Sequence, residues 1–202
     1  TNDSDLPVAP TNTVNFCTDM ELNNNQQHYG LISILLHWSM ALVIIGLYFL
    51  GLYMVDLTYY DELYQIAPDI HRSVGLIMVA FLLFRWYWRV RSIRPAISGK
   101  SWEKTAAVWA HRTFYILILA ALISGYLIST ADGQPVSIFG WIDIPATFYG
   151  YANQEDIAGD VHEIITHLLM LLVAIHTSAA LKHHFIERDT TLLGMLGRVA
   201  KK

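Results

Sequence analysis

The stretch HEIITHLLMLLVAIH, residues 162–176, begins and ends on a histidine and is mostly apolar in between. These two histidines, His162 and His176, are fourteen residues apart. In an α-helix that separation spans about 21 Å, at about 1.5 Å per residue, and returns to within about 40° of the same face. The stretch therefore predicts one helix that presents two imidazoles on a single stripe, one toward each end.

The rest of the chain is equally apolar. Of its 202 residues, 54% are hydrophobic and only 15% are charged, far from the average of soluble proteins. Four apolar segments lie at about residues 30–55, 70–90, 112–132 and 163–182. Each supplies the roughly 20 residues that a helix needs to cross about 30 Å of hydrocarbon. One such segment could be a core helix of a soluble protein. Four predict an all-α membrane protein with a four-transmembrane-helix bundle, surrounded by lipid and without a nucleic-acid partner.

The charges predict how this bundle is oriented. Lysine and arginine dominate the connection between the second and third segments and the C-terminal tail, whereas the other two connections are acidic. The positive-inside rule then places both termini in the cytoplasm. Cys17 is the sole cysteine, and the sequence holds no CxxCH motif for covalent haem attachment.

The chain is expected to have three parts. Residues 1–27 form a polar tail, either mobile or held by a partner. Residues 28–188 form the transmembrane domain, and residues 189–202 form a short amphipathic helix on the membrane surface. The long connection at 130–160 is expected to fold over the outer end of the bundle. No internal repeat is evident.

Histidines are numerous for so apolar a chain, at nine, and an ionisable side chain inside a span marks a functional candidate. From the segment bounds, His71 and His162 begin their segments at the outer level. His111 begins its segment at the inner level, where His37 and His176 also fall. The outer pair can only be His71 with His162. The inner pair is His176 with either His37 or His111.

Paired imidazoles from facing helices suit a b-type haem, whose iron takes two axial ligands. With both axial positions filled, none is open for oxygen, which favours electron transfer. A lone membrane histidine is more often a structural hydrogen-bonding group, so the matched levels are the stronger signal. Two matched pairs predict two haem b groups at two depths of the membrane.

Arginines are candidates for binding the haem propionates. Arg85 lies fourteen residues after His71, and a buried arginine needs an anion, which it would hold by a bidentate contact. In the alternative interpretation, Arg85 and Arg89 only extend to the inner lipid headgroups. Arg72, the only basic residue of the outer connections, is a third candidate.

Two further features have more than one interpretation. His183 lies seven residues after His176 and is an alternative ligand, a proton donor or an interfacial group, of which the last two are favoured near the polar boundary. Four glycines of the segments would admit porphyrin edges or serve ordinary helix packing. They are Gly46, Gly51, Gly75 and Gly125.

Several motifs together resemble the prokaryotic cytochrome b561 family, from about Tyr29 to Met195. They are His37-Trp38, the run His71-Arg72-Ser73-Val74-Gly75, Arg85 with Arg89, His111 with Tyr115, His162-Glu163, the run from His176 through Ala179-Ala180 to His183-His184-Phe185, and Asp189 with Leu192-Leu193 and Met195. Any one of them alone is weak, and the set is specific.

The resemblance implies a quinone-linked oxidoreductase of the bacterial inner membrane with two haems. It implies that His37 and His176 hold the inner haem. It implies likewise that His71 and His162 hold the outer one. His111 would then be free to contact the carbonyl of ubiquinone or another quinone, or to relay its protons. A member of this family acts as a superoxide:ubiquinone oxidoreductase.

This sequence departs from that picture at its outer connections. Superoxide is an anion and should be steered by positive potential, but these connections are acidic, with Arg72 as their only basic residue. A protein electron donor, or a larger respiratory complex held by the tail, is as consistent with the residues. The alternative function is a haem b membrane-anchor and electron-transfer subunit of a larger dehydrogenase or hydrogenase. The matched histidine levels argue against a haem-free transporter.

Overall fold

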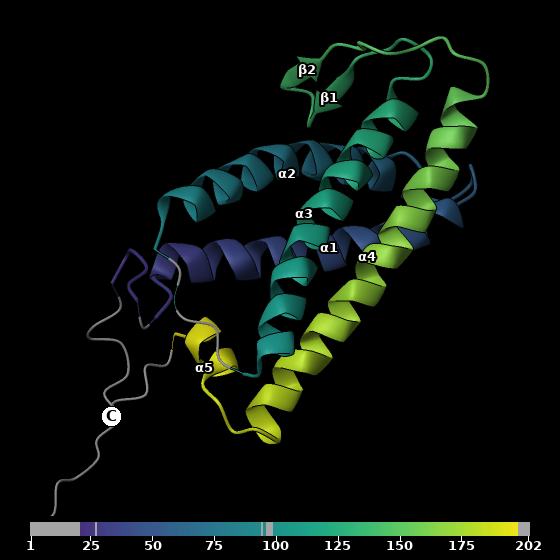
Figure 1. The fold of residues 1–202 in the computed structure, drawn as a ribbon. Helices are drawn as coiled ribbons and strands as arrows, with labels where there is room; N and C mark the ends of the chain where they lie inside the picture. Colours follow the sequence, from purple (N-terminus) through teal and green to yellow (C-terminus); the bar gives the residue numbers. More distant parts are fainter. Residues whose placement is uncertain (1–20, 27, 94, 96–98, 198–202) are drawn as a thin grey trace, which may run out of the picture.

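The computed structural model describes residues 21–26, 28–93, 95 and 99–197 (Figure 1). Most of the predicted N-terminal tail and the last residues of the predicted C-terminal helix lie outside the described residues. The elements are α1 (Leu31–Val55), α2 (Ile66–Arg91), α3 (Ser101–Ser129), β1 (Val136–Ile138), β2 (Ile142–Ile144), α4 (Gln154–Phe185) and α5 (Thr191–Met195).

The four long helices have the length and composition of membrane spans. They contain 25, 26, 29 and 32 residues, and each holds an apolar window with few charged residues. Sheet in the described part is limited to one antiparallel pair of three-residue strands. The predicted all-α membrane fold with four spanning helices is therefore confirmed.

Three helices begin earlier than their apolar segments, α2 by about one turn and the other two by more. α3 begins at Ser101 and α4 at Gln154, so His111 is the eleventh residue of α3 and His162 the ninth of α4. The expectation that these histidines begin their helices is wrong. Hydropathy marks where side chains meet hydrocarbon, whereas the backbone hydrogen bonds of a helix continue into the polar region. Glu103 adds to the early start of α3, because its Oε2 accepts the backbone N–H of Lys100 at 2.8 Å.

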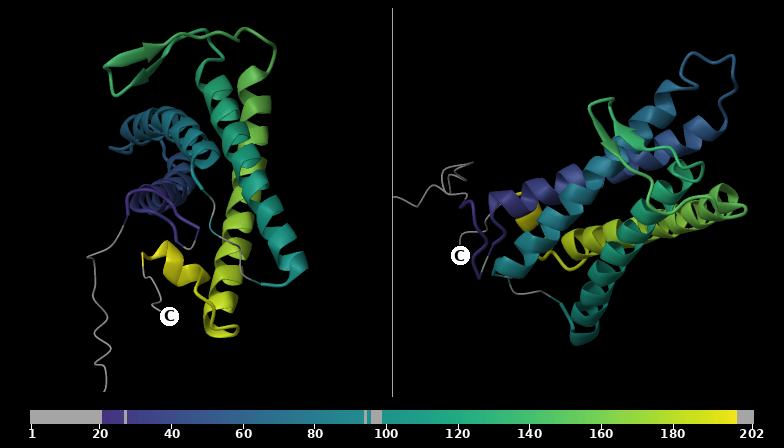
Figure 2. Two further views of the ribbon diagram at one scale, coloured as in Figure 1. Left: turned by 60° about the vertical axis from the view of Figure 1, so that its left-hand side comes forward. Right: turned by 90° about the horizontal axis from the view of Figure 1, so that it is seen from above.

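The helices form two antiparallel hairpins that cross each other. α1 packs on α2 and α3 packs on α4, while α2 also contacts α3. Figures 1 and 2 show the first hairpin crossing the second. We keep the name outer end for the end of the bundle that holds His71 and His162, and inner end for the opposite end.

Both ends of the described chain lie at the inner end of the bundle. Trp38 Nε1 donates to the carbonyl of Met195 at 2.8 Å, which holds α5 beside the first turns of α1. Asn24 Nδ2 donates to the carbonyl of Ile93 at 3.1 Å and ties the N-terminal segment to the end of α2. The chain therefore enters and leaves the bundle on the same side, as an even number of spans requires.

A β-hairpin covers the outer end of α2. Phe139 and Gly140 both adopt positive φ, 49° and 73°, the backbone that a tight hairpin turn requires. Ser73 Oγ of α2 accepts the N–H of Phe139 at 3.0 Å and donates to the carbonyl of Ser137 at 3.3 Å. The long connection thus folds back over the bundle, as expected. Its strands were not predicted, because three residues are too few for an alternating pattern.

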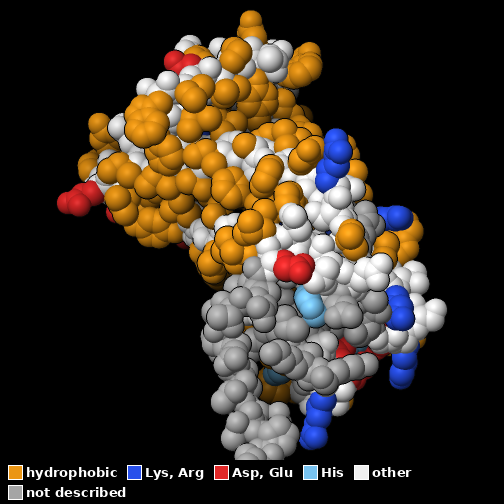
Figure 3. All heavy atoms as spheres, turned by 90° about the vertical axis from the view of Figure 1, so that its left-hand side faces the viewer, with side chains coloured by type: hydrophobic (Ala, Val, Ile, Leu, Met, Phe, Trp, Pro, Cys, Tyr) orange, Lys and Arg blue, Asp and Glu red, His pale blue; other side chains and the backbone are white. Residues whose placement is uncertain are grey.

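The buried core is small and draws on all four helices. It contains Met40, Met78, Leu82, Ile118 and Leu169. Many other large apolar side chains of the helices are exposed, as is normal where lipid is the solvent. In Figure 3 hydrophobic side chains cover the upper part of the face shown, and lysine and arginine gather lower on it.

Candidate functional site

The outer histidines face each other across the two hairpins. The ring centroids of His71 on α2 and His162 on α4 are 6.2 Å apart, with their planes at 72°. His162 Nδ1 lies 3.0 Å from the carbonyl oxygen of Ala121 and 3.0 Å from Ser124 Oγ. A carbonyl can only accept, so Nδ1 carries the proton and the lone pair of Nε2 is free for a metal.

Each outer histidine packs against a glycine of its partner helix. A Cβ at Gly51 of α1 would lie 3.4 Å from Cε1 of His71, and one at Gly125 of α3 would lie 3.3 Å from Cε1 of His162. The same Cβ at Gly46 or Gly75 would meet nothing within 4 Å. Two of the four glycines therefore leave room for imidazole rings, a contact that the sequence did not reveal.

At the inner end three histidines converge. The ring of His176 lies 6.3 Å from that of His37 and 5.7 Å from that of His111, measured between centroids. Phe114 closes one side of His176, with ring centroids 5.4 Å apart. Both candidates left open by the sequence are therefore neighbours of His176.

Arg85 contacts a histidine at this end. Its Nη2 lies 3.2 Å from Nδ1 of His37. Because a guanidinium only donates hydrogen bonds, His37 Nδ1 must be the acceptor in this contact. A neutral His37 then carries its proton on Nε2. Coordination through Nε2 would require the opposite tautomer, so this contact must open before His37 can bind iron in that way.

The other two arginine candidates contact other residues. The Arg89 guanidinium lies 5.9 Å from the ring centroid of Tyr115, a cation–π contact. Arg72 pairs with Asp69 one turn earlier on α2, and both side chains are exposed. Arg72 and Asp69 also line a cavity of about 490 Å³ between α2 and the β-hairpin.

His183 sits among carboxylates that sequence reasoning missed. Its Nδ1 lies 2.6 Å from Glu187 Oε2 and 2.9 Å from Asp189 Oδ2. Lys182 Nζ lies 2.8 Å from both Glu187 Oε1 and the buried Glu103 Oε1. Glu187 and Asp189 follow the helix, and only the turn after α4 brings them back to His183.

These groups form a cluster at the inner surface rather than at the histidine level. Glu103, His183 and Glu187 offer ligand atoms within 4.8 Å of one another, but the Lys182 ammonium already supplies a cation to both carboxylates. Glu103 precedes His111 by eight residues on α3, or about 12 Å along the helix. The structure therefore does not bring together His183 and His111, the two histidines predicted to handle protons.

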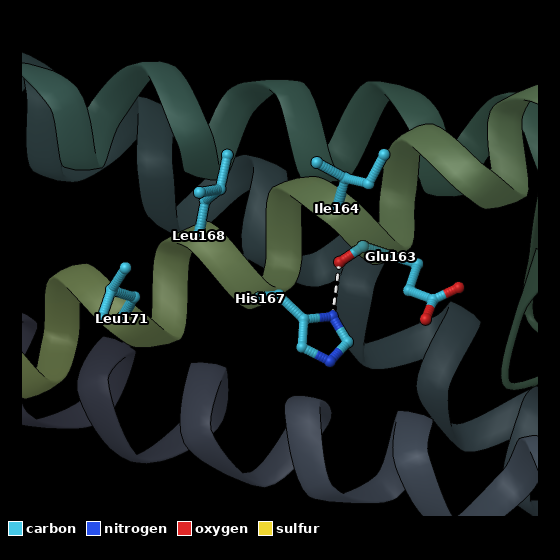
Figure 4. Close-up of a pocket in the computed structure, with 5 residues that line it drawn as sticks. All are labelled: Glu163, Ile164, His167, Leu168 and Leu171. Carbon is cyan, nitrogen blue, oxygen red and sulfur yellow. Dashed lines mark hydrogen bonds between the residues drawn. The ribbon is translucent and has the colours of Figure 1, made fainter.

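His167 is an intramembrane histidine that the sequence analysis did not assign. It lines a shallow groove of about 400 Å³ on α4 with Glu163 and three apolar side chains. In Figure 4 its ring extends from α4 toward α1, where it meets Tyr48 with centroids 5.7 Å apart. Its Nδ1 donates to the Glu163 carbonyl at 2.8 Å, so its hydrogen-bonding needs are met largely within its own helix.

The two helix hairpins repeat one pattern with a spacing of seven residues. In α1 and α3 the positions are His37, Ile44, Gly51 and His111, Ile118, Gly125; in α2 and α4 they are His71, Met78, Arg85 and His162, Leu169, His176. The contacts repeat as well. His71 packs on Gly51 as His162 packs on Gly125, and Arg85 meets His37 as His176 meets His111. The sequence therefore does hold an internal repeat, visible only as equal spacings within helices.

The middle positions of this repeat form an apolar layer. Met78, Ile118 and Leu169 are 2%, 9% and 5% exposed, and Ile44 packs against them. This layer lies seven residues, or about 10 Å of helix, from either histidine level. It separates the two histidine groups.

The paired histidines have the spacing that a bis-histidine metal centre needs. Two imidazoles on opposite sides of one metal, with bonds of about 2.0 Å, place their ring centroids about 6 Å apart. The outer pair at 6.2 Å and the inner pair His37–His176 at 6.3 Å meet this requirement. The donor set, four imidazoles with arginine beside the inner pair, fits haem b.

Comparison with known proteins points to one family. A family model described as prokaryotic cytochrome b561 matches residues 28–198. Cytochrome b561 homolog 2 of Escherichia coli (strain K12) is 44% identical over 181 residues, which cover 89% of this chain and 96% of that protein. Cytochrome b561 homolog 1 of the same strain is 28% identical over 139 residues, covering 67% and 77%. A Yersinia pestis protein named probable superoxide oxidase CybB is 26% identical over 172 residues, covering 80% and 97%.

Proposed function

Because the chain belongs to the prokaryotic cytochrome b561 family, whose members carry haem b and transfer electrons in membranes, we propose that it binds two haems and links an electron donor to the quinone pool. The outer haem is held by His71 and His162. The inner haem is held by His176, with His37 as the partner that the family resemblance implies.

The observation that carries this proposal is the pair of histidine groups on either side of an apolar layer. Each group has the spacing of two axial ligands, and the layer of Met78, Ile118 and Leu169 keeps them apart. A haem held by each pair of histidines would accept and release one electron at a time. The protein holds the iron ligands at fixed depths, so electrons cross between the two ends of the bundle.

The inner end also has hydrogen-bonding groups suited to a quinone. Tyr115 Oη is buried and lacks a hydrogen-bond partner in the described part of the chain. It lies one turn after His111 and beneath the Arg89 guanidinium. These groups could donate to a quinone carbonyl. Reduction of a quinone takes two electrons and two protons, and we assign the final proton transfer to His111.

Protons reach this end through the cluster around His183. Its imidazole lies between the carboxylates of Glu187 and Asp189, close to where α4 leaves the membrane. Carboxylate and imidazole side chains serve as proton carriers in many enzymes. The cluster would hold protons for the quinone, and solvent or His111 would complete the path, because the His183 and His111 side chains occupy different depths.

The residues at the outer end do not indicate a single class of electron donor. One relative is named a probable superoxide oxidase, but Arg72, the one arginine here, is already paired with Asp69. The cavity between α2 and the β-hairpin is bordered by this ion pair. An acidic outer surface would attract a basic protein donor or a partner subunit, which keeps an electron-transfer subunit of a larger complex as the second candidate. We place both termini and the His183 cluster on the cytoplasmic side of the inner membrane.

The deciding experiment is haem stoichiometry combined with a redox titration of the purified full chain in detergent. We expect two haem b per chain by pyridine haemochrome assay and two one-electron transitions. One haem per chain, or none, would overturn the proposal.

Stopped-flow mixing with superoxide, and separately with a quinol, then identifies the donor. Rapid haem reduction by superoxide would favour the oxidase. Slow reduction together with co-purifying subunits would favour the larger complex.

A further inference from the structure

The connection between α3 and α4 is tied down by hydrogen bonds at both of its ends, so it forms a defined surface. Tyr126 Oη of α3 donates to the carbonyl of Pro145 at 2.7 Å. Gln154 Nε2 of α4 donates to the carbonyl of Phe148 at 3.0 Å. Ser73 holds the β-hairpin on α2. We call residues 130–153 the outer cap, and Figure 2 shows it extending beyond the ends of α3 and α4.

Large aromatic and apolar side chains are exposed on the outer cap. Trp141, directly after the turn of the β-hairpin, is 88% exposed. Exposed apolar groups that gather in one place mark interaction surfaces, and aromatic residues supply much of the binding energy of protein interfaces. The other exposed members are Phe139, Ile142, Phe148, Tyr149 and Tyr151. The outer cap therefore has the apolar composition of a docking surface.

The outer cap and the first turns of α4 also carry charge of one sign. Residues 130–160 contain carboxylates but no lysine or arginine. Every one of these carboxylates is exposed, and none of them pairs with a basic side chain among the described residues. They are Asp132, Asp143, Glu155, Asp156 and Asp160. A partner that neutralises them must itself be positively charged.

This combination favours one kind of occupant. Segments that lie on a membrane surface use lysine and arginine to bind anionic lipid headgroups, and the outer cap has neither. Charge alone would attract a basic subunit and a basic soluble protein equally. The core of a permanent interface is depleted in charged residues, whereas exposed charges steer the encounter of transient partners. Aromatic side chains among exposed carboxylates therefore suit transient docking of a basic protein.

The outer cap also lies at the outer histidine pair. Ser73, which bonds to the backbone of both Ser137 and Phe139 in the hairpin, follows His71 by only two residues on α2. A protein seated on the outer cap would therefore meet the bundle at the end where the outer haem is held.

We propose that the outer cap is the docking surface of a soluble, basic electron-carrier protein. This inference rests on the proposed two-haem function and names the class of its electron donor. The reduced carrier gives one electron to the ferric outer haem, so the carrier is oxidised and the haem becomes ferrous. No proton moves in this step.

The test measures binding of a basic probe to the full chain in non-ionic detergent by calorimetry, a readout that needs no turnover. Cytochrome c, a soluble basic haem protein, is the probe, and succinylated cytochrome c, whose lysines are converted to carboxylates, is its matched acidic control. We expect only the basic probe to bind. Its affinity should fall at least about 10-fold between about 0.01 and 0.15 M salt, because the Debye length shortens from about 30 to about 8 Å.

Variants locate the contact on the outer cap. Trp141→Ala should weaken binding at least about 10-fold, the loss expected for an aromatic hot spot. Asp143→Lys should weaken it about threefold at low salt, the size expected for one exposed ion pair. Glu62→Lys makes the same change of charge in the connection between α1 and α2 and should have a smaller effect. All three variants should keep both haems.

Electron exchange is measured by stopped flow. The dithionite-reduced chain should be oxidised by ferric cytochrome c faster than by the succinylated form. Equal rates, equal binding of the two probes, or equal effects of Asp143→Lys and Glu62→Lys would overturn the inference. An unchanged affinity in Trp141→Ala would do the same.

A lipid-bound cap is the remaining outcome. In nanodiscs of brominated phospholipid, quenching of the fluorescence that Trp141→Phe removes would place the outer cap in the bilayer and overturn the inference. A chain with two haems that binds neither probe also overturns it, but leaves the proposed function standing. Fewer than two haems per chain overturns the proposed function itself.

Discussion

At the outer end of the bundle the two helix hairpins contribute the same residues, whereas at the inner end they do not. The outer end pairs His71 with His162, and each ring lies against a glycine. The inner end sets Arg85 in one hairpin against His176 in the other, with His37 and His111 beside them. The two ends therefore use the same repeated positions of the hairpins, but only the outer end has matching residues there.

The difference between the two ends suits two different functions. Glycine packing leaves the outer rings little freedom, which suits a site that only accepts and passes on electrons. The inner end has a surplus imidazole, two arginines and the Tyr115 hydroxyl, which has no hydrogen-bond partner among the described residues. Such polar groups suit a site where electrons meet protons. We therefore expect quinone reduction at the inner end, where the residues of the two hairpins differ.

The largest expected effect comes from removing a haem ligand at the outer end. His162→Ala should remove the outer haem, about half of the haem content, because no other described histidine lies next to His71. The pyridine haemochrome assay measures this loss. His167→Ala, five residues along the same helix, is the matched control and should retain both haems. A His162→Ala protein with full haem content would reassign the outer pair.

Proton handling should be confined to the inner end. We expect His183→Gln to slow quinone reduction by less than about 10²-fold, the lower range for loss of a general acid, because His111 still makes the final transfer, and to leave haem content unchanged. The rate is measured with a soluble quinone analogue across a pH series. Glu163→Gln, at the outer half of α4, is the control and should leave the rate unchanged. Equal rates in wild type and His183→Gln would remove His183 from the proton path.

An alanine substitution, which adds one methyl group, tests whether the outer glycines leave room for the histidine rings. Gly125→Ala would bring a Cβ to 3.3 Å from Cε1 of His162, and overpacking of this kind typically costs about 1–3 kcal/mol. We expect weaker retention of the outer haem during thermal titration followed by its Soret absorbance. Gly75→Ala meets nothing within 4 Å and should match the wild type. Equal haem retention in both variants would show that His162 has room to shift.

The smallest effect concerns the short connection between α1 and α2 at the outer end. Asp61 Oδ2 accepts from the backbone N–H and the hydroxyl of Thr58, both at 2.7 Å, and these bonds lower the pKa of its carboxyl. Because the pKa of Asp61 is lower in the folded chain, its ionised carboxylate stabilises the fold at pH values above the ordinary carboxyl pKa. This contribution is lost as the pH falls through the folded-state pKa. Asp61→Asn should therefore melt slightly below the wild type at neutral pH. The two melting temperatures should converge in strong acid; a constant gap would contradict this.

Much of the site followed from counting residues along helices. Depth in a membrane is a local property of sequence, so His71 and His162 could be matched in level before any contact was known. The helix bounds could not be found in this way, because hydropathy does not detect helical turns outside the apolar segments, such as those before His111. The carboxylates around His183 were also missed, since their approach depends on the turn after α4.

By itself, the sequence determined that four apolar helices cross a membrane and that their histidines fall at two depths, because hydrophobicity and helical rise act residue by residue. Only the tertiary structure decided which rings meet. It set Gly51 and Gly125 against the outer histidines, brought both His37 and His111 to His176, and turned Arg85 toward His37 rather than toward lipid. These contacts depend on how the two hairpins cross, and the crossing is fixed by packing between side chains far apart in the chain.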